Sequence, residues 1–227
     1  MSALTRGVIG VCALSGVCGG GYGLHKLLSN DSIESKLKAN EYVLLTNSIE
    51  HEKHWDEILA SYKATIQADN NSKFKFDNFV ISNTQPNAED KTKLKEHCKK
   101  TLKKRTFEDN EEAEYNKAKR WCVIPSTVSE KLATDKFEVL DTTTGDGATN
   151  KHDNEWAKKI KAYIDSKNTN KIASWTNGAP TQDNKEDKEK LINKCKELVN
   201  TKTHQPNYEK AFEDAKNWCI MPKESGS

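Results

Sequence analysis

Apolar residues recur in this chain at the spacing of one face of a helix. Between residues 49 and 67 they stand at i, i+3, i+4, i+7 and i+11, as Trp55, Ile58, Leu59, Tyr62 and Ile66. A single apolar stripe on an otherwise polar segment predicts an amphipathic helix. Related patterns predict further helices at residues 88–104, 111–123, 154–166, 185–200 and 208–221. Proline cannot continue a helix, so Pro125 and Pro222 end two of them. Alternating apolar runs are few, which makes a large sheet unlikely and predicts a mainly α fold.

The second half of the chain repeats the first. One set of four residues recurs after 101 positions: His51, Trp55, Leu59 and Tyr62 return as His152, Trp156, Ile160 and Tyr163. A second set recurs after 97 positions: Cys98, Trp121, Cys122 and Pro125 return as Cys195, Trp218, Cys219 and Pro222. A period this long indicates two copies of one small domain, because solenoid repeats are shorter, at about 20–50 residues.

We therefore expect two tandem, repeat-related three-helix bundle domains at residues 49–125 and 152–222. A short strand is expected in the first, where copy one is longer and carries Phe74, Phe76, Phe79, Val80 and Ile81. This divergent segment is where differences in binding are most expected. A polar, glycine-containing linker is expected at 126–151, a stalk at 29–48 and a short tail at 223–227.

The N-terminal segment predicts a membrane anchor over residues 1–28. Residues 7–24 contain no charge, and 18 residues lie at the lower edge of a membrane span. A retained, single-pass signal-anchor is favoured. A cleaved signal peptide, a lipoprotein signal at Cys18 and a buried soluble helix remain alternatives. Lysines flank the apolar run on its far side, so charge alone does not fix the orientation.

Four cysteines form two pairs of equal spacing, Cys98/Cys122 and Cys195/Cys219. If the helices at 88–104 and 111–123 fold back on each other around residue 110, each cysteine of the first pair lies twelve residues from the turn. That geometry permits a disulfide. A structural zinc site and two free buried thiols are the alternatives; for zinc, copy one offers His97 as a further ligand but copy two has Lys194 there. Disulfides are favoured, and they indicate an oxidising, extracellular location.

No residue pattern predicts catalysis, a cofactor or a metal. His51 and His152 lie four residues before a tryptophan, which predicts a structural His–Trp stack, and no nucleophile or orienting carboxylate recurs beside them. Asp141 and Asp146 lack the ligand spacing of a calcium loop. The repeat core is expected to comprise Trp55, Leu59, Tyr62, Trp121, Trp156, Ile160, Tyr163 and Trp218.

Charge narrows the expected partners only a little. Charged residues make up 31% of the chain but the net charge is +2, so no nucleic-acid partner is expected. The densest basic run, residues 91–105, could bind phosphates, sulfated glycans or anionic lipid headgroups. Acidic residues interrupt its counterpart in copy two, which favours a solvated helix face.

The end of each repeat carries a shared motif, RWCVIP at residues 120–125 and NWCIMP at residues 217–222. With the glycine-rich N-terminus and the lysine- and glutamate-rich body, it resembles the large paralogous families of uncharacterised proteins in haemotropic mycoplasmas. The resemblance implies a membrane-associated, surface-exposed protein that takes part in host contact or antigenic variation, and it carries over no functional residues. We expect a non-enzymatic surface protein. A small-ligand or lipid-binding helical protein is the alternative, and a hydrolase is a less favoured one.

Overall fold

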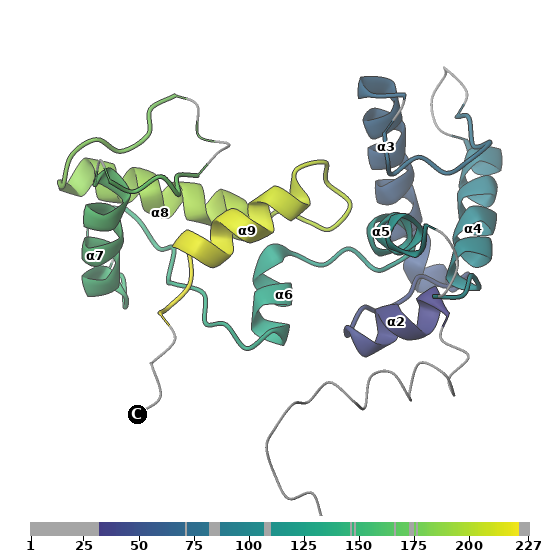
Figure 1. The fold of residues 1–227 in the computed structure, drawn as a ribbon, viewed down its shortest axis with the longest axis horizontal. Coiled ribbons are helices and arrows are strands. Elements are labelled where there is room, and N and C mark those ends of the chain that lie inside the picture. Colours follow the sequence, from purple (N-terminus) through teal and green to yellow (C-terminus); the bar gives the residue numbers. More distant parts are fainter. Residues whose placement is uncertain are drawn as a thin grey trace, which may run out of the picture. The chain divides into compact units, whose positions relative to one another are not determined.

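Helices make up nearly all the regular structure of the described residues. The structure is a computed structural model that describes residues 32–222 except 71, 82–86, 107–109, 146, 148, 166, 173–174 and 176. In chain order the elements are α2 (Ile33–Ala39), the 3₁₀ turn η1 (Ile49–His51), α3 (Glu52–Ala68), α4 (Ala88–Leu102), α5 (Glu111–Trp121), α6 (Val128–Thr134), α7 (Asp153–Ile164), α8 (Lys185–Val199) and α9 (Tyr208–Trp218) (Figure 1). Strand pairing in these residues is limited to isolated bridges. The predicted mainly α fold is confirmed.

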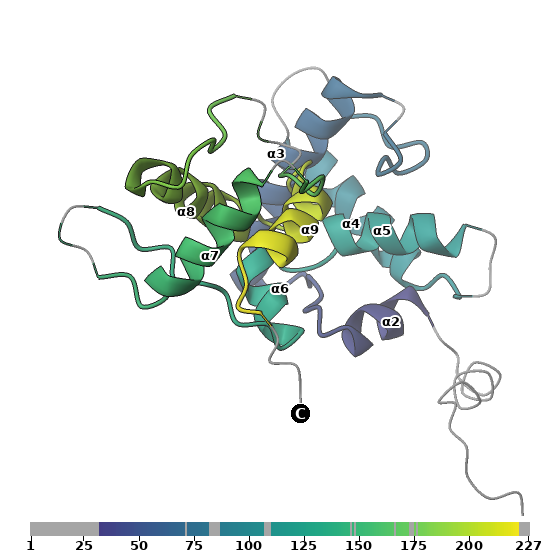
Figure 2. The same cartoon turned by 60° about the vertical axis from the view of Figure 1, so that its left-hand side comes forward.

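The order and lengths of the helices repeat between the two halves. Helices α2 and α6 have seven residues each, α4 and α8 have fifteen, and α5 and α9 have eleven. Helix α7 is shorter than α3, with twelve residues against seventeen. Figure 2 shows the same succession from a second direction. Among the described residues, each half therefore contains four α-helices where the sequence pattern predicts three.

The additional helices, α2 and α6, lie in the segments expected to be stalk and linker. Ser32 and Thr127 cap them, each side-chain oxygen accepting a hydrogen bond from a backbone N–H of the first turn. The apolar residues one turn apart on each helix are fully buried: Ile33 and Leu37 on α2, Val128 and Leu132 on α6. Both helices therefore belong to the packed structure.

Each half has its own hydrophobic core. The core of the first half combines α2 with α3, α4 and α5 around Trp55 and Trp121. The core of the second half combines α6 with α7, α8 and α9 around Trp156 and Trp218. All eight positions expected to form the repeat core are buried in one or the other.

Two extended segments close each half, which explains why α5 and α9 end before the predicted positions. Val123 forms a bridge with Leu44, and Ile220 forms the equivalent bridge with Val139. The amide of Ile124 donates to the carbonyl of Val43 at 2.8 Å. These backbone groups pair with a distant segment and so cannot extend the helix toward the following proline.

The short strand expected at residues 74–81 is not present in the described residues. The chain makes successive turns there, with Asn78 at a φ of 58°. Phe76 and Phe79 are buried and stack on Tyr62, with ring centroids 5.9 and 4.9 Å apart. The aromatic side chains thus enter a helical core from an irregular loop.

The predicted anchor at residues 7–24 and the tail at 223–227 lie outside the described residues. Within residues 32–222, as described, no helix is long and apolar enough to cross a membrane.

Candidate functional site

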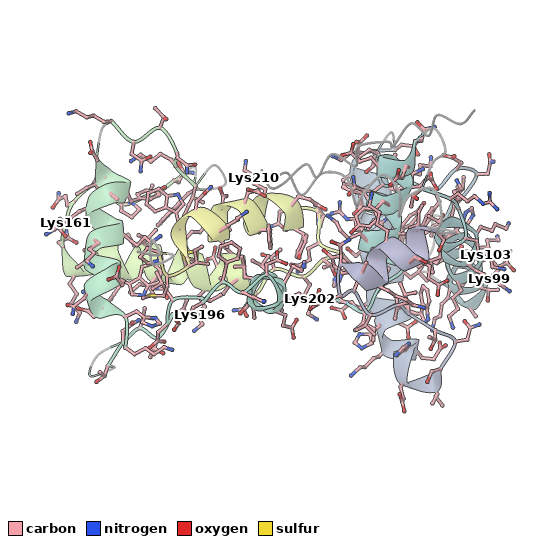
Figure 3. All side chains as sticks on the ribbon, turned by 60° about the horizontal axis from the view of Figure 1, so that its bottom comes forward. Lys99, Lys103, Lys161, Lys196, Lys202 and Lys210 are labelled. Atoms are coloured by element: carbon pink, nitrogen blue, oxygen red, sulfur yellow. A yellow bond between two sulfur atoms is a disulfide. The ribbon has the colours of Figure 1, made fainter. Side chains whose placement is uncertain are left out.

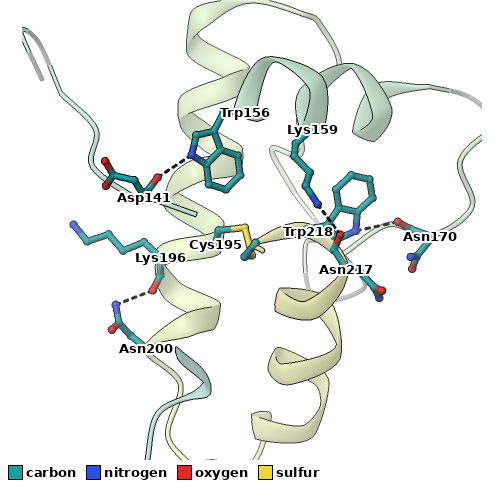
Figure 4. The surroundings of a disulfide bond; sticks show 10 residues. Asp141, Trp156, Lys159, Asn170, Cys195, Lys196, Asn200, Asn217 and Trp218 are labelled. Carbon is teal, nitrogen blue, oxygen red and sulfur yellow. Dashed lines mark hydrogen bonds between the residues drawn. A yellow bond between two sulfur atoms is a disulfide. The ribbon is translucent and has the colours of Figure 1, made fainter. Parts of the chain in front are cut away.

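The four repeated cysteines form two disulfides, as the spacing predicts. Cys98 on α4 is bonded to Cys122, and their Cα atoms are 5.4 Å apart. Cys195 on α8 is bonded to Cys219, with a Cα separation of 5.5 Å (Figure 4). Each bond joins the third helix of its half to the residue that follows the fourth. All four sulfur atoms therefore serve to cross-link helices.

The repeated histidine and the tryptophan four residues later hold the backbone of one loop residue. In the first half, the amide of Thr46 donates to Nδ1 of His51 at 2.9 Å, and its carbonyl accepts from Nε1 of Trp55 at 2.9 Å. A spacing of four places both side chains on one face of the helical segment. The predicted His–Trp stack is replaced by this joint contact with the loop.

The second half repeats this arrangement. The amide of Asp141 donates to Nδ1 of His152, and its carbonyl accepts from Nε1 of Trp156, both at 2.8 Å. Nδ1 is a hydrogen-bond acceptor in both halves, so a neutral ring carries its proton on Nε2. The histidine and tryptophan therefore recur because each pair fixes the same loop to its helix.

A second contact between side chains and a loop also recurs. Nε1 of Trp121 donates to the carbonyl of Phe74 at 2.8 Å, and the hydroxyl of Tyr62 accepts from the amide of Phe76 at 3.0 Å. The two rings meet edge to face at 5.1 Å. Burial raises the pKa of Tyr62 to about 12, so its hydroxyl stays protonated at neutral pH.

The equivalent residues of the second half make the equivalent bonds. Nε1 of Trp218 donates to the carbonyl of Asn170 at 3.1 Å (Figure 4). The hydroxyl of Tyr163 accepts from the amide of Ile172, and its ring lies 4.8 Å from that of Trp218. Two loops in each half are thus fixed by one histidine, two tryptophans and one tyrosine.

Asp141, which lacks the spacing of a calcium ligand, forms hydrogen bonds within its own loop. Its carboxylate accepts hydrogen bonds from the hydroxyl and amide of Thr143 and from the amide of Lys151. These bonds, that of the Thr143 hydroxyl foremost, lower its pKa. Among the described residues, no group of three or more histidine, cysteine or acidic side chains is placed to hold a metal.

A cleft lies in the segment that distinguishes copy one. Its volume is about 450 Å³, and it is lined by Asn70, Ser72, Lys73, Lys75, Phe76, Asp77, Asn78 and Lys117. Lys117 contributes from α5; its ammonium lies 2.8 Å from the Glu114 carboxylate and 3.7 Å from that of Asp77. The lining is polar and rich in lysine, and it contains no histidine or cysteine. Such a surface suits recognition of small polar groups.

One contact between the two halves is not predicted by the repeat. Arg120 of the first half is 1% exposed and donates to the carbonyl of Gln205 in the second half at 2.6 Å. Its guanidinium lies 3.9 Å from the centre of the Phe74 ring. The matching position in the second half is Asn217, which is exposed. Arg120 therefore joins the halves through a contact that the repeat does not predict.

Comparison of the chain with known protein families, with curated proteins and with solved structures gave no match.

Proposed function

We propose that this protein is a non-enzymatic surface protein, held in the cell membrane by residues 7–24, that displays two repeat-related helical domains outside the cell. Its role would be contact with a host surface or variation as an antigen. The domains correspond to the two halves described above, each with its own core and its own disulfide.

This proposal rests on the bonds that the repeated side chains form. Every repeated histidine, tryptophan and tyrosine is bonded to a loop backbone, and every repeated cysteine is in a disulfide. What the two copies share is therefore scaffold. The copies differ in the loop after the second helix of each half and in the charges at the end of the third, where a display protein would carry its variable contacts.

The disulfides support the location outside the cell. Bonds of this kind form and persist in oxidising compartments and are rare in the cytosol. Two such bonds in halves of this size also fit small domains that must withstand an extracellular environment, because a small core alone stabilises little.

The alternatives receive less support. A lipid carrier needs an apolar cavity between its helices, whereas the two cores are filled by large aromatic side chains and the 450 Å³ cleft has a polar lining. A hydrolase needs an activated nucleophile, and the repeated histidines already accept backbone hydrogen bonds.

Labelling of intact cells tests the proposal. Cells carrying the protein are treated with a membrane-impermeant lysine reagent before or after permeabilisation, and modified peptides are quantified by mass spectrometry. We expect peptides from both halves to be modified in intact cells, and the protein to stay with the membrane pellet in alkaline carbonate. Modification only after permeabilisation would place the halves inside the cell. Release by carbonate would rule out the anchor.

A further inference from the structure

Four basic residues gather at the C-terminal end of α4 and just beyond it. We refer to them as the α4 basic end: Lys99, Lys100, Lys103 and Arg105. All four are exposed, and none has an ion-pair partner among the described residues. Lys99 and Lys103, one helical turn apart, lie next to each other at the edge of the first half (Figure 3). Glu96, one turn upstream, is the acidic residue of α4 nearest to them in sequence.

The other lysines of this basic run are neutralised locally. Lys91 and Lys95 bind the carboxylate of Glu52 on α3, and Lys93 binds Glu89 one turn away. Lys104 lies 2.8 Å from Glu114. The charges of the upstream part of α4 are therefore balanced by ion pairs, whereas those at its end are exposed without ion-pair partners among the described residues.

The second half does not reproduce this cluster on the same scaffold. The positions that match the α4 basic end are Lys196, Glu197, Asn200 and Lys202. Lys202 is paired with Glu57 at 2.7 Å, and Glu197 is itself acidic and binds Lys194. Only Lys196 remains as an unpaired cation there. The cluster therefore belongs to the half that is nearer to the N-terminus.

The cluster also lies where the chain enters the described structure. Ser32 forms a bridge with Arg105, and the amide of Ile33 donates to the carbonyl of Lys104 at 3.0 Å. Seven residues, 25–31, separate this point from the apolar segment at 7–24. Seven extended residues span at most about 25 Å, so the α4 basic end cannot lie far from a membrane that holds that segment.

We propose that the α4 basic end binds the anionic headgroups of the membrane in which residues 7–24 are embedded. This inference rests on the proposed membrane attachment and adds the face that the first half turns toward the lipid. Where the facing leaflet carries anionic lipid, clustered lysine and arginine close to it are attracted, and the attraction falls off within a Debye length, about 8 Å at physiological salt.

The test uses the full chain reconstituted into vesicles of phosphatidylcholine alone or mixed with phosphatidylglycerol. After flotation, lysines are acetylated at trace level and the rate at each is determined by mass spectrometry. With the anionic lipid, we expect Lys99, Lys100 and Lys103 to react about fivefold more slowly, the effect of one basic group held near an anionic surface. Lys196 and Lys210, exposed in the second half (Figure 3), should react equally in both vesicles. The protection should disappear at about 1 M salt, where the Debye length is about 3 Å.

A pair of charge-reversal variants separates this contact from general electrostatics. In K99E/K100E/K103E, Arg105 becomes the reporter, and its modification by phenylglyoxal should be as fast on anionic as on neutral vesicles. In the control K167E/K196E/K210E, which changes the net charge equally in the second half, Arg105 should stay protected about fivefold.

The outcomes distinguish the two proposals. A chain that fails to float with the vesicles overturns the membrane attachment, and this inference with it. A chain that floats but shows equal lysine reactivity on both lipids leaves the attachment standing and overturns the contact of the α4 basic end. Protection that arises only when heparin is added would assign the cluster to a sulfated glycan and overturn the lipid contact.

Discussion

At the scale of single residues, most side chains singled out by the repeat have an identified backbone partner. His51 and His152 accept one amide each, and four tryptophans donate to four carbonyls. His204 has no such counterpart in the repeat. It is 4% exposed, its carbonyl accepts from the hydroxyl of Ser61, and its ring lies 3.5 Å from the carboxylate of Glu57. It therefore lies in the contact that Arg120 also makes between the halves.

The environment of His204 predicts a loss of stability in mild acid. Burial, foremost, lowers its pKa below the ordinary 6.5; Lys202, Arg120 and His54 act in the same direction, and Glu57 opposes them. A histidine whose pKa is depressed on folding stabilises the native state above about pH 6.5, and this contribution is lost as the pH falls below that value. We expect the free energy of unfolding, measured by urea denaturation, to decrease between about pH 7 and pH 5.

The variant His204→Gln isolates this contribution. It keeps a polar side chain at the site and removes the titration, so the pH dependence should become shallower than in the wild type. Some slope should remain, because burial also lowers the pKa of His97. An unchanged slope in His204→Gln would show that His204 does not contribute.

At the scale of elements, the sequence predicts the long helices well and misses the short ones. The predicted helix at 185–200 corresponds to α8 at Lys185–Val199, and that at 88–104 to α4 at Ala88–Leu102. Helices this long carry several turns of apolar periodicity. Helices α2 and α6 have seven residues and two buried apolar positions each, too few to establish a period. Their burial depends on pairing with distant segments, which local periodicity does not report.

The role of α6 gives a direct prediction for Leu132. A linker would tolerate its truncation, whereas the fully buried Leu132 packs in the core of the second half. Leu132→Ala should lower the free energy of unfolding by about 2–5 kcal/mol, through lost apolar contact and the cavity left behind. The exposed neighbour Ala133→Ser is the control and should change it by no more than about 0.5 kcal/mol. If urea denaturation gave the same free energy of unfolding for both variants, α6 would be a linker that does not contribute to the core.

At the scale of the whole molecule, one scaffold is used twice with different surfaces. Lys117, which lines the cleft of the first half, corresponds to Asp214 in the second, and Arg120 corresponds to Asn217. The repeat itself, the disulfides and the position of the divergent segment could be predicted from the sequence. The cleft, the Arg120 contact and the division of the basic run into paired and unpaired lysines could not, because each depends on which residues meet in the folded chain.

The two disulfides stabilise this scaffold, and they support its proposed location outside the cell. For a closed loop with a sequence separation of 24 residues, each bond contributes about 3 kcal/mol in the chain-entropy account. In halves with small cores this is a large share of the stability. Both the stability of the fold and its proposed location therefore depend on the redox state of these cysteines in the cell.

The most direct measurement is the thiol state of the protein in its own cells. Cells are lysed in the presence of an alkylating reagent without reductant, and the digested protein is analysed by mass spectrometry. We expect peptides that join Cys98 to Cys122 and Cys195 to Cys219, with no alkylation at these four residues. Four alkylated cysteines would show that the scaffold is unbonded in the cell, and would contradict both the stapled fold and its display outside the membrane.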